Sequence, residues 1–331
     1  MTHRAVRLIA AAAAAVCLQA AGARVGAQSN HAPQSGAAAK PWVVPRTADG
    51  QPDLQGIWDY RTLTPLERPP QFAGKEFLTD QEIADYERRA AARPDGRPPD
   101  DARTDPSVHP VEWLDYGKRV VGNRRSSLVV DPPDGRIPPR SAEGKERDAA
   151  VRAAARGRGP ADNPEDRSLW ERCVTRGVPE GMLPGAYNNN LQILQTRDHV
   201  LLISEMIHDA RVVPLDGRPH APSAIRSWTG DPRGHWEGDT LVVDSTNFSE
   251  RSNFRGSRAG LHLVERFRRV DAQTLEYSFT VEDPSTWTRP WTVQFPMARA
   301  SGEIYEYACH EGNYGLQNIL KAGRATDEKP E

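Results

Sequence analysis

The sequence predicts a mainly β fold, in which an antiparallel meander curves into a barrel-like sheet with a few flanking helices and long loops. From about residue 190 onward, apolar residues recur with a period of two, the period of a strand that buries one face. Short links rich in turn-forming residues separate these runs, which favours antiparallel neighbours. The preceding stretch, residues 60–180, is irregular and carries separate helix start and stop signals.

The first 27 residues have the layout of a secretory signal peptide. Arg4 and Arg7 give a positive start, residues 8–18 form an apolar run, and small residues precede a cleavage site after Ala27. The apolar run is shorter than a membrane-spanning helix requires, although an uncleaved anchor is the alternative. No later stretch is apolar enough to span a bilayer. We therefore expect a periplasmic or secreted protein with no membrane span in its mature chain.

The mature chain is expected to form a single domain. Residues 28–40 are small and polar, which indicates a disordered leader, and the β-rich domain is expected over 41–325. Its helical and loop-rich half covers 41–185, and its β-meander core covers 186–325. The chain has 43 basic and 45 acidic residues, a balance that argues against nucleic-acid binding. The expected partner is a small molecule, and the oligomeric state stays open.

Three helices are expected in the first half. Thr79 and Glu82 form a capping box that starts the first helix. Ser141 begins a second, charged and alanine-rich helix. Asn163 caps a third helix, with Pro164 at its first position. Glycine or proline follows each pattern, so these helices are expected to end near residues 92, 155 and 177.

The clearest strand pattern lies at residues 274–281. Leu275, Tyr277, Phe279 and Val281 alternate with polar residues, which predicts one buried and one solvated face. Other strands are expected at 191–195, 199–204, 240–244, 261–270, 290–297 and 303–308, and residues 52–58 as a first strand or a plug. About eight such strands fit a calycin-like (lipocalin-like) barrel or a sandwich, and we favour the barrel.

Four sequence runs are distinctive. They are residues 52–58 (PDLQGIW), 214–220 (PLDGRPH), 228–248 (WTGDPRGHWEGDTLVVDSTNF) and 308–314 (ACHEGNY). Together they resemble a large group of uncharacterised exported proteins of soil and aquatic bacteria, over nearly all of the mature chain. The resemblance implies export and a single-family architecture, and it implies no activity.

The mature chain keeps two cysteines, Cys173 and Cys309. In an oxidising compartment an isolated pair is most simply a disulfide, and two unpaired thiols are the alternative. The bond would tie the middle of the chain to the last expected strand. In the chain-entropy model it would contribute on the order of 4–5 kcal/mol.

The densest group of polar residues lies in sixteen positions after the strand 199–204. It comprises Glu205, His208, Asp209, Arg211, Asp216, Arg218 and His220. Loops at strand ends commonly carry binding and catalytic groups. Glu205 and His208 are expected to act as an acid–base pair, and Arg211, Asp216, Arg218 and His220 to bind the substrate. The alternative is a solvated connector with structural ion pairs.

Two other stretches extend the expected site. His310 and Glu311 follow Cys309, and a bridged cysteine would hold them in place as a further catalytic pair; the alternative is a structural histidine near a disulfide. Two turns are expected at 231–239, where Asp231, Arg233 and Trp236 would offer hydrogen bonds and a stacking platform to a substrate. Trp236 could instead plug the end of the barrel.

Asn188 lies in a run of three asparagines before the first core strand, and it is expected to line the barrel mouth as a further substrate-binding residue. A plain turn is the alternative. Glu205, His208, His220 and His310 offer donors of the type that zinc binds, but their spacing fits no known ligand pattern, so no metal ligands are assigned. A divalent metal stays an alternative to the expected absence of cofactors.

Several sequence motifs of common enzyme classes are absent. The chain has no Gly-x-Ser-x-Gly elbow, no phosphate-binding loop, no dinucleotide fingerprint and no Cys-x-x-Cys pair. Acid–base chemistry needs only a few converging side chains and is not excluded by these absences. The sequence therefore predicts a hydrolase or lyase without a redox cofactor, acting on a small polar or aromatic, glycoside-like molecule. The alternative is a lipocalin-like binding protein without catalysis.

Overall fold

The computed structural model of the protein describes residues 42–100, 114–309, 312 and 314–327. These residues lie in one compact unit, Trp42–Glu331. The expected signal peptide and leader lie outside the described residues, and so do His310 and Glu311. No described helix has the length and apolar character needed to cross a membrane.

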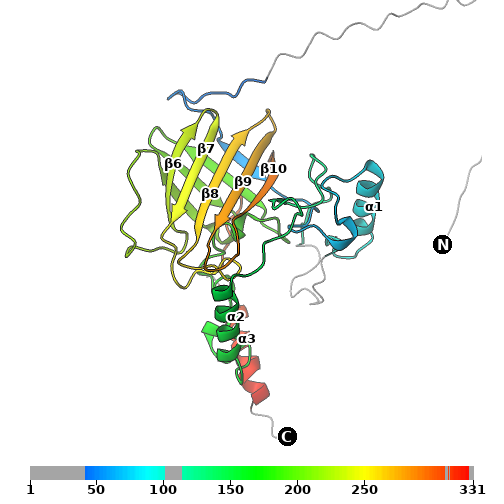
Figure 1. The fold of residues 1–331 in the computed structure, drawn as a ribbon, viewed down its shortest axis with the longest axis vertical. Helices are drawn as coiled ribbons and strands as arrows, with labels where there is room; N and C mark the ends of the chain where they lie inside the picture. Colours follow the sequence, from blue (N-terminus) through cyan, green and yellow to red (C-terminus); the bar gives the residue numbers. More distant parts are fainter. Residues whose placement is uncertain (1–41, 101–113, 310–311, 313, 328–331) are drawn as a thin grey trace, which may run out of the picture. The chain divides into compact units, whose positions relative to one another are not determined.

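The unit is mainly β, as the sequence predicts (Figure 1). Its strands are β1 (Gly56–Asp59), β2 (Val129–Asp131), β3 (Asn190–Gln195), β4 (His199–Ser204), β5 (Ala210–Pro214), β6 (Asp231–Glu237), β7 (Thr240–Thr246), β8 (His262–Arg269), β9 (Thr274–Glu282) and β10 (Trp291–Arg299). Its helices are α1 (Asp80–Ala91), α2 (Ala142–Ala154) and α3 (Tyr314–Asp327).

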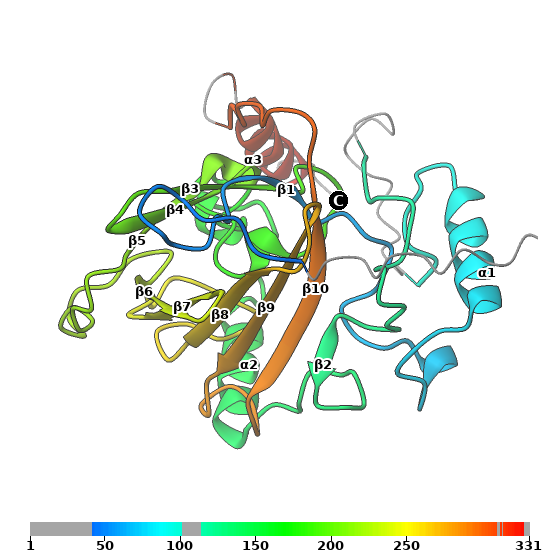
Figure 2. The same cartoon turned by 90° about the horizontal axis from the view of Figure 1, so that it is seen from above.

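The strands form one antiparallel sheet in the order β5-β4-β3-β1-β10-β9-β8-β7-β6, and β2 pairs with β10. Strand β1 pairs with both β3 and β10 and thereby joins two meanders, β3–β5 and β6–β10. The sheet curves until its two edge strands, β5 and β6, lie side by side (Figure 2). The result is the nearly closed barrel that the sequence predicts.

Gly234 allows the two edges to meet. A Cβ atom at this position in β6 would lie 2.7 Å from the Val213 Cγ1 of β5 and 2.7 Å from the Leu215 Cδ2 that follows it. Real Cβ atoms do not approach other atoms this closely, so a side chain here would push the edges apart. Gly234 therefore has a structural role within the distinctive 228–248 run.

Side chains fill the barrel interior. Leu275, Tyr277, Phe279 and Val281 of β9 are all buried, which confirms the alternation predicted for this strand. Around them pack the large apolar side chains of the neighbouring strands, among them Trp58, Phe267, Trp291 and Phe295. A cavity beside Leu191 and Arg211 measures only about 10 Å³, close to the least that one water molecule needs. The interior is therefore a packed core rather than a ligand-holding calyx.

The 52–58 run contains the start of β1, and its last residue, Trp58, fills part of the barrel interior. Trp58 is fully buried, and its indole nitrogen donates to the Leu54 carbonyl oxygen at 2.9 Å. The guanidinium carbons of Arg269 and Arg299 lie 5.7 and 5.6 Å from the Trp58 ring centre. Gly56, at φ 136°, brings the backbone so near to Arg299 that a Cβ would lie 3.2 Å from its Nη2. This run has a structural role.

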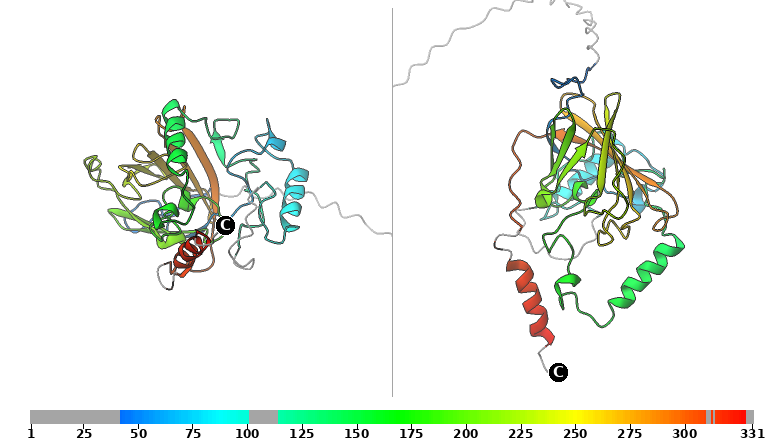
Figure 3. Two further views of the ribbon diagram at one scale, coloured as in Figure 1. Left: turned by 90° about the horizontal axis from the view of Figure 1, so that it is seen from below. Right: turned by 90° about the vertical axis from the view of Figure 1, so that its left-hand side faces the viewer.

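The capping residues predict two helices correctly. The Thr79 hydroxyl accepts from the Glu82 backbone nitrogen at 3.2 Å, and the Glu82 carboxylate accepts from the Thr79 nitrogen at 2.9 Å. The Ser141 hydroxyl accepts from Gly144 at the start of α2. The helices lie outside the curved sheet (Figure 3).

Other element predictions are wrong. Residues 303–308 form no strand, so Cys309 does not end one, and the expected helix after Asn163 is a single 3-10 turn, Pro164–Asp166. Two turns are expected at 231–239. The first of them lies inside β6, and only residues 238–239, after the strand, form a turn. Strand β5 lies within the expected loop 205–220, and helix α3 is not predicted at all.

Candidate functional site

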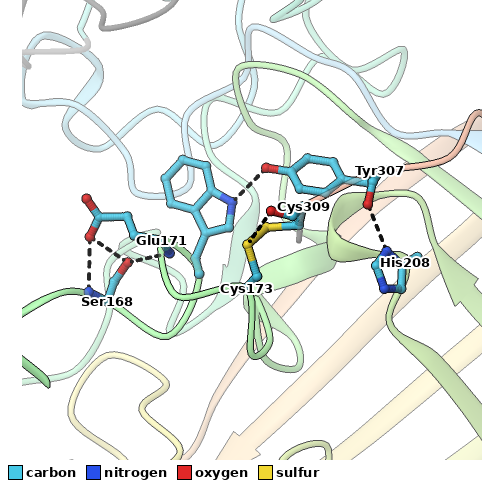
Figure 4. The surroundings of a disulfide bond; sticks show 7 residues. Ser168, Glu171, Cys173, His208, Tyr307 and Cys309 are labelled. Carbon is cyan, nitrogen blue, oxygen red and sulfur yellow. Dashed lines mark hydrogen bonds between the residues drawn. A yellow bond between two sulfur atoms is a disulfide. The ribbon is translucent and has the colours of Figure 1, made fainter. Parts of the chain in front are cut away.

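The described residues of the predicted site do not converge on one place. Glu205 is buried and accepts a hydrogen bond from Asn190 Nδ2 at 2.8 Å. The exposed His208 lies instead against residue 307, with its Nδ1 2.9 Å from the Tyr307 carbonyl oxygen (Figure 4). The side chains of the expected acid–base pair are thus engaged with different partners. Asn188 has a φ of 54°, and its carbonyl accepts from the Tyr60 hydroxyl at 3.3 Å, which fits the plain-turn alternative.

Arg211 points into the barrel rather than toward a ligand. Its guanidinium makes two hydrogen bonds to the Glu265 carboxylate, of 2.5 and 2.9 Å, and the Tyr277 hydroxyl donates to the same carboxylate at 2.8 Å. All three side chains are buried, and burial raises the pKa of Tyr277 well above its usual range. A buried charge needs such compensation, so Arg211 is held in a structural network.

His220, Asp231 and Arg233 do lie together, on the outer face of the barrel. His220 Nδ1 lies 3.1 Å from Asp231 Oδ2, and Arg233 Nη2 lies 3.0 Å from Asp231 Oδ1. His220 Nε2 lies 3.1 Å from Asp244, whose carboxylate also meets His262 Nε2 at 3.1 Å. The hydrogen bond to Asp244 raises the pKa of His262, and the same bond lowers the pKa of Asp244.

Asp216 and Arg218 lie in the loop beside this outer-face group, where Arg233 Nε donates to the Pro219 carbonyl oxygen at 3.1 Å. Asp216 and Arg218 pair with each other at 2.5 Å in the exposed loop after β5. Trp236 packs against the barrel core, and its buried indole nitrogen has no hydrogen-bond partner among the described residues. Within the described part of the chain, no group of three or more His, Cys, Asp or Glu side chains could hold a metal ion.

The Cys173–Cys309 disulfide is present, with Cα atoms 5.7 Å apart (Figure 4). Beside it, the Trp170 indole nitrogen donates to the Tyr307 hydroxyl at 3.3 Å. The disulfide and this hydrogen bond attach residues 168–176 to residues 305–309. Residues 168–176 form one wall of a cleft that sequence reasoning does not find.

The cleft has a volume of about 880 Å³ and opens between residues 165–180 and residues 248–261, with Trp228 beside them. Six arginines line it, against two glutamates, Glu165 and Glu180. We call it the arginine cleft, after Arg167, Arg172, Arg176, Arg251, Arg255 and Arg258. The described residues of the site predicted from the sequence lie elsewhere.

Both walls of the arginine cleft are anchored to the barrel. In the first wall, the Thr175 hydroxyl and the Arg176 backbone nitrogen donate to the Asp209 carboxylate at 2.8 and 3.1 Å. In the second wall, Phe254 and Ser257 exchange two backbone hydrogen bonds of 2.9 Å in a tight hairpin, which is fixed to the barrel because Phe254 packs in its core. The hairpin carries Arg255 at its tip. These contacts fix both walls of the cleft against the barrel.

The arginines of the cleft differ in their partners. Arg167 pairs with Glu171, Arg255 with Glu180 at 3.3 Å, and Arg172 with Glu165 at 3.9 Å. Among the described residues, no carboxylate lies within 4.0 Å of the other three arginines, which are Arg176, Arg251 and Arg258. Arg251 and Arg258 are exposed, and Arg176 is half-buried. The cleft therefore has cationic groups that are available to an anion.

Aromatic surface lies beside these cations. The Arg176 guanidinium carbon lies 4.3 Å from the Trp170 ring centre, close enough for a cation–π contact. Trp228 is half-buried in the same lining. A ligand in the arginine cleft would thus meet charge and flat apolar surface together.

Comparisons with known proteins add nothing to the geometry of the site. No protein-family model matches the chain, and no curated protein matches it. One sequence signal could have pointed to the cleft, because Arg251, Arg255 and Arg258 lie within eight positions. The other three arginines lie some eighty residues earlier in the sequence, and only the fold brings the two groups together.

Proposed function

We propose that this protein binds a small anionic molecule in the arginine cleft. The observation that carries the proposal is the meeting of three arginines without carboxylate partners among the described residues in one cleft of about 880 Å³. This volume lies within the usual range for ligand pockets, of about 300–1,000 Å³. Guanidinium groups bind carboxylates and phosphates through paired hydrogen bonds, so an acidic ligand fits best.

Binding has better support than the hydrolase or lyase expected from the sequence. Acid–base catalysis needs a proton donor and acceptor within reach of one substrate. Glu205 and His208 face different partners, and the two carboxylates in the arginine cleft, Glu165 and Glu180, already lie near arginines. Because the barrel interior is packed, we place the ligand in the cleft rather than in a lipocalin-like calyx.

We also propose that the protein works in the periplasm or outside the cell. The layout of the first 27 residues supports export. The Cys173–Cys309 disulfide supports an oxidising compartment, since such bonds are rare in the cytosol.

The proposal is tested by ligand retention. Purified mature protein is incubated with an extract of plant and bacterial small molecules, washed, and analysed by mass spectrometry. The test variant carries Arg251→Gln and Arg258→Gln. The control carries Arg266→Gln and Arg268→Gln, the same change of charge at two exposed arginines on the outer face of β8.

We expect the native protein and the control to retain the same acidic compounds unchanged, and the test variant to lose them. Equal retention by all three proteins would contradict the arginine cleft as the binding site. Conversion of a compound by the native protein would instead support the hydrolase or lyase.

A further inference from the structure

A second, smaller cavity adjoins the arginine cleft. Its volume is about 230 Å³, and it shares Arg176, Glu180 and Arg255 with the cleft. We call it the side compartment. Its lining is largely apolar and includes Pro65, Leu66, Tyr116, Leu128, Leu183 and Pro184.

The side compartment differs from the arginine cleft in chemistry. Leu128 belongs to the barrel core, and Leu66 and Leu183 pack against that core from outside. The charged groups that line the compartment are Asp100 and the three that it shares with the cleft, Arg176, Glu180 and Arg255. An apolar cavity of about 150 Å³ is enough to hold a benzene ring, so a compartment of about 230 Å³ has room for one.

An ion pair stands at the boundary between the two cavities. Arg255 Nε lies 3.3 Å from Glu180 Oε2, and Arg255 Nη2 lies 3.4 Å from Glu180 Oε1. Both side chains are partly exposed, so water weakens the pair. An anionic ligand would compete with Glu180 for Arg255, and a ligand in that position would reach both cavities.

We propose that the ligand is an aryl or arylalkyl carboxylate that spans both cavities. Its carboxylate would lie among the arginines of the cleft, and its ring would enter the side compartment past Arg255 and Glu180. The inference rests on the proposed function, because it takes the arginine cleft as the anion site. It adds the class of ligand and identifies Leu66 and Leu183 as the residues that select for a ring.

Isothermal titration calorimetry of the mature protein tests this inference with four probes. They are inorganic phosphate, acetate, 4-phenylbutyrate and the neutral 4-phenylbutan-1-ol. Leu183→Trp fills the side compartment, whose lining includes Arg176 but neither Arg251 nor Arg258, and Leu66→Trp fills it from a second position. Leu194→Trp, on the exposed outer face of β3, is the matched control. Circular dichroism melts verify that each variant is folded.

We expect 4-phenylbutyrate to bind the native protein and Leu194→Trp about tenfold more tightly than acetate, or more, because it buries a ring. The folded filling variants should lose this preference and keep their affinity for phosphate. The Arg251→Gln, Arg258→Gln double variant should weaken both anions. The alcohol should bind much more weakly than the carboxylate.

The failures of the two proposals are distinguishable. If the native protein binds phosphate and acetate but shows no preference for 4-phenylbutyrate, or if both folded filling variants keep the preference, the side-compartment inference is wrong and the anion site stands. If the native protein binds none of the anions, or binds the alcohol as tightly as the carboxylate, the proposed function fails and the inference with it.

Discussion

Replacing Glu265 by glutamine tests the interpretation that Arg211 has a structural position in the barrel core. The Arg211 side chain is 3% exposed and that of Glu265 is fully buried, so the substitution leaves an uncompensated charge inside the protein. Removing one partner of a buried ion pair costs about 3–5 kcal/mol. This is a large part of the roughly 5–15 kcal/mol by which domains are stable.

The assay is urea denaturation monitored by tryptophan fluorescence. Free energies of unfolding are compared between variants that share the same dependence on urea concentration. A double variant, Arg211→Met with Glu265→Leu, removes both charges and should recover most of the loss, because packed apolar groups can replace a buried pair. Glu276→Gln, which breaks the exposed pair with Arg268, should cost less than about 1 kcal/mol.

A cost below about 1 kcal/mol for Glu265→Gln would contradict a structural position for Arg211, since it would mean that water reaches Arg211. Arg211 would then be free to meet a ligand, as the sequence suggests. A double variant as unstable as the single one would also refute it, because unpaired charge would not be the cause of the loss.

Three further perturbations have defined outcomes. Replacing Cys173 and Cys309 by serine opens a loop across a separation of 136 residues and should lower the free energy of unfolding by about 5 kcal/mol, measured as a lower urea midpoint. Gly234→Val should cost about 1–3 kcal/mol by forcing β5 and β6 apart, and an unchanged melting temperature would contradict this. Because its folded pKa is raised, protonated His262 stabilises the protein fully below about pH 6.5, and this contribution is lost as pH rises through that folded pKa. The folded pKa of Asp244 is lowered, so the ionised Asp244 stabilises the protein fully above about pH 4, and this contribution is lost as pH falls through the folded pKa. His262→Gln should therefore flatten the stability profile above about pH 6.5, and an unchanged profile would contradict the assignment.

The sequence predicts most of the fold because one face of most strands is apolar. Residues 274–281 show this, since every second side chain enters the core. Strand β5 escapes prediction because Arg211, which faces inward, is charged. Glu265, which compensates the charge of Arg211, lies 54 positions later in the sequence. A local sequence pattern cannot predict that these two residues pair. Strand β6 escapes because Pro232 and Gly234 look like turn residues.

The candidate site is harder to predict than the fold. The high density of titratable residues after β4 suggests one site there. However, the alternation of side chains along β5 points Arg211 into the barrel, whereas Asp216 and Arg218 lie in the exposed loop after β5. The arginine cleft depends on contacts between segments some eighty residues apart, together with a disulfide between positions 173 and 309. Such long-range proximity follows from the fold and not from local sequence.

The central claim is that the arginine cleft binds a small anion. Native mass spectrometry of the mature protein after incubation with the small-molecule extract tests it most directly, beside the Arg251→Gln, Arg258→Gln variant and the Arg266→Gln, Arg268→Gln control. We expect an acidic ligand on the native protein and the control, and none on the cleft variant. The same acidic ligand retained equally by all three proteins would contradict it.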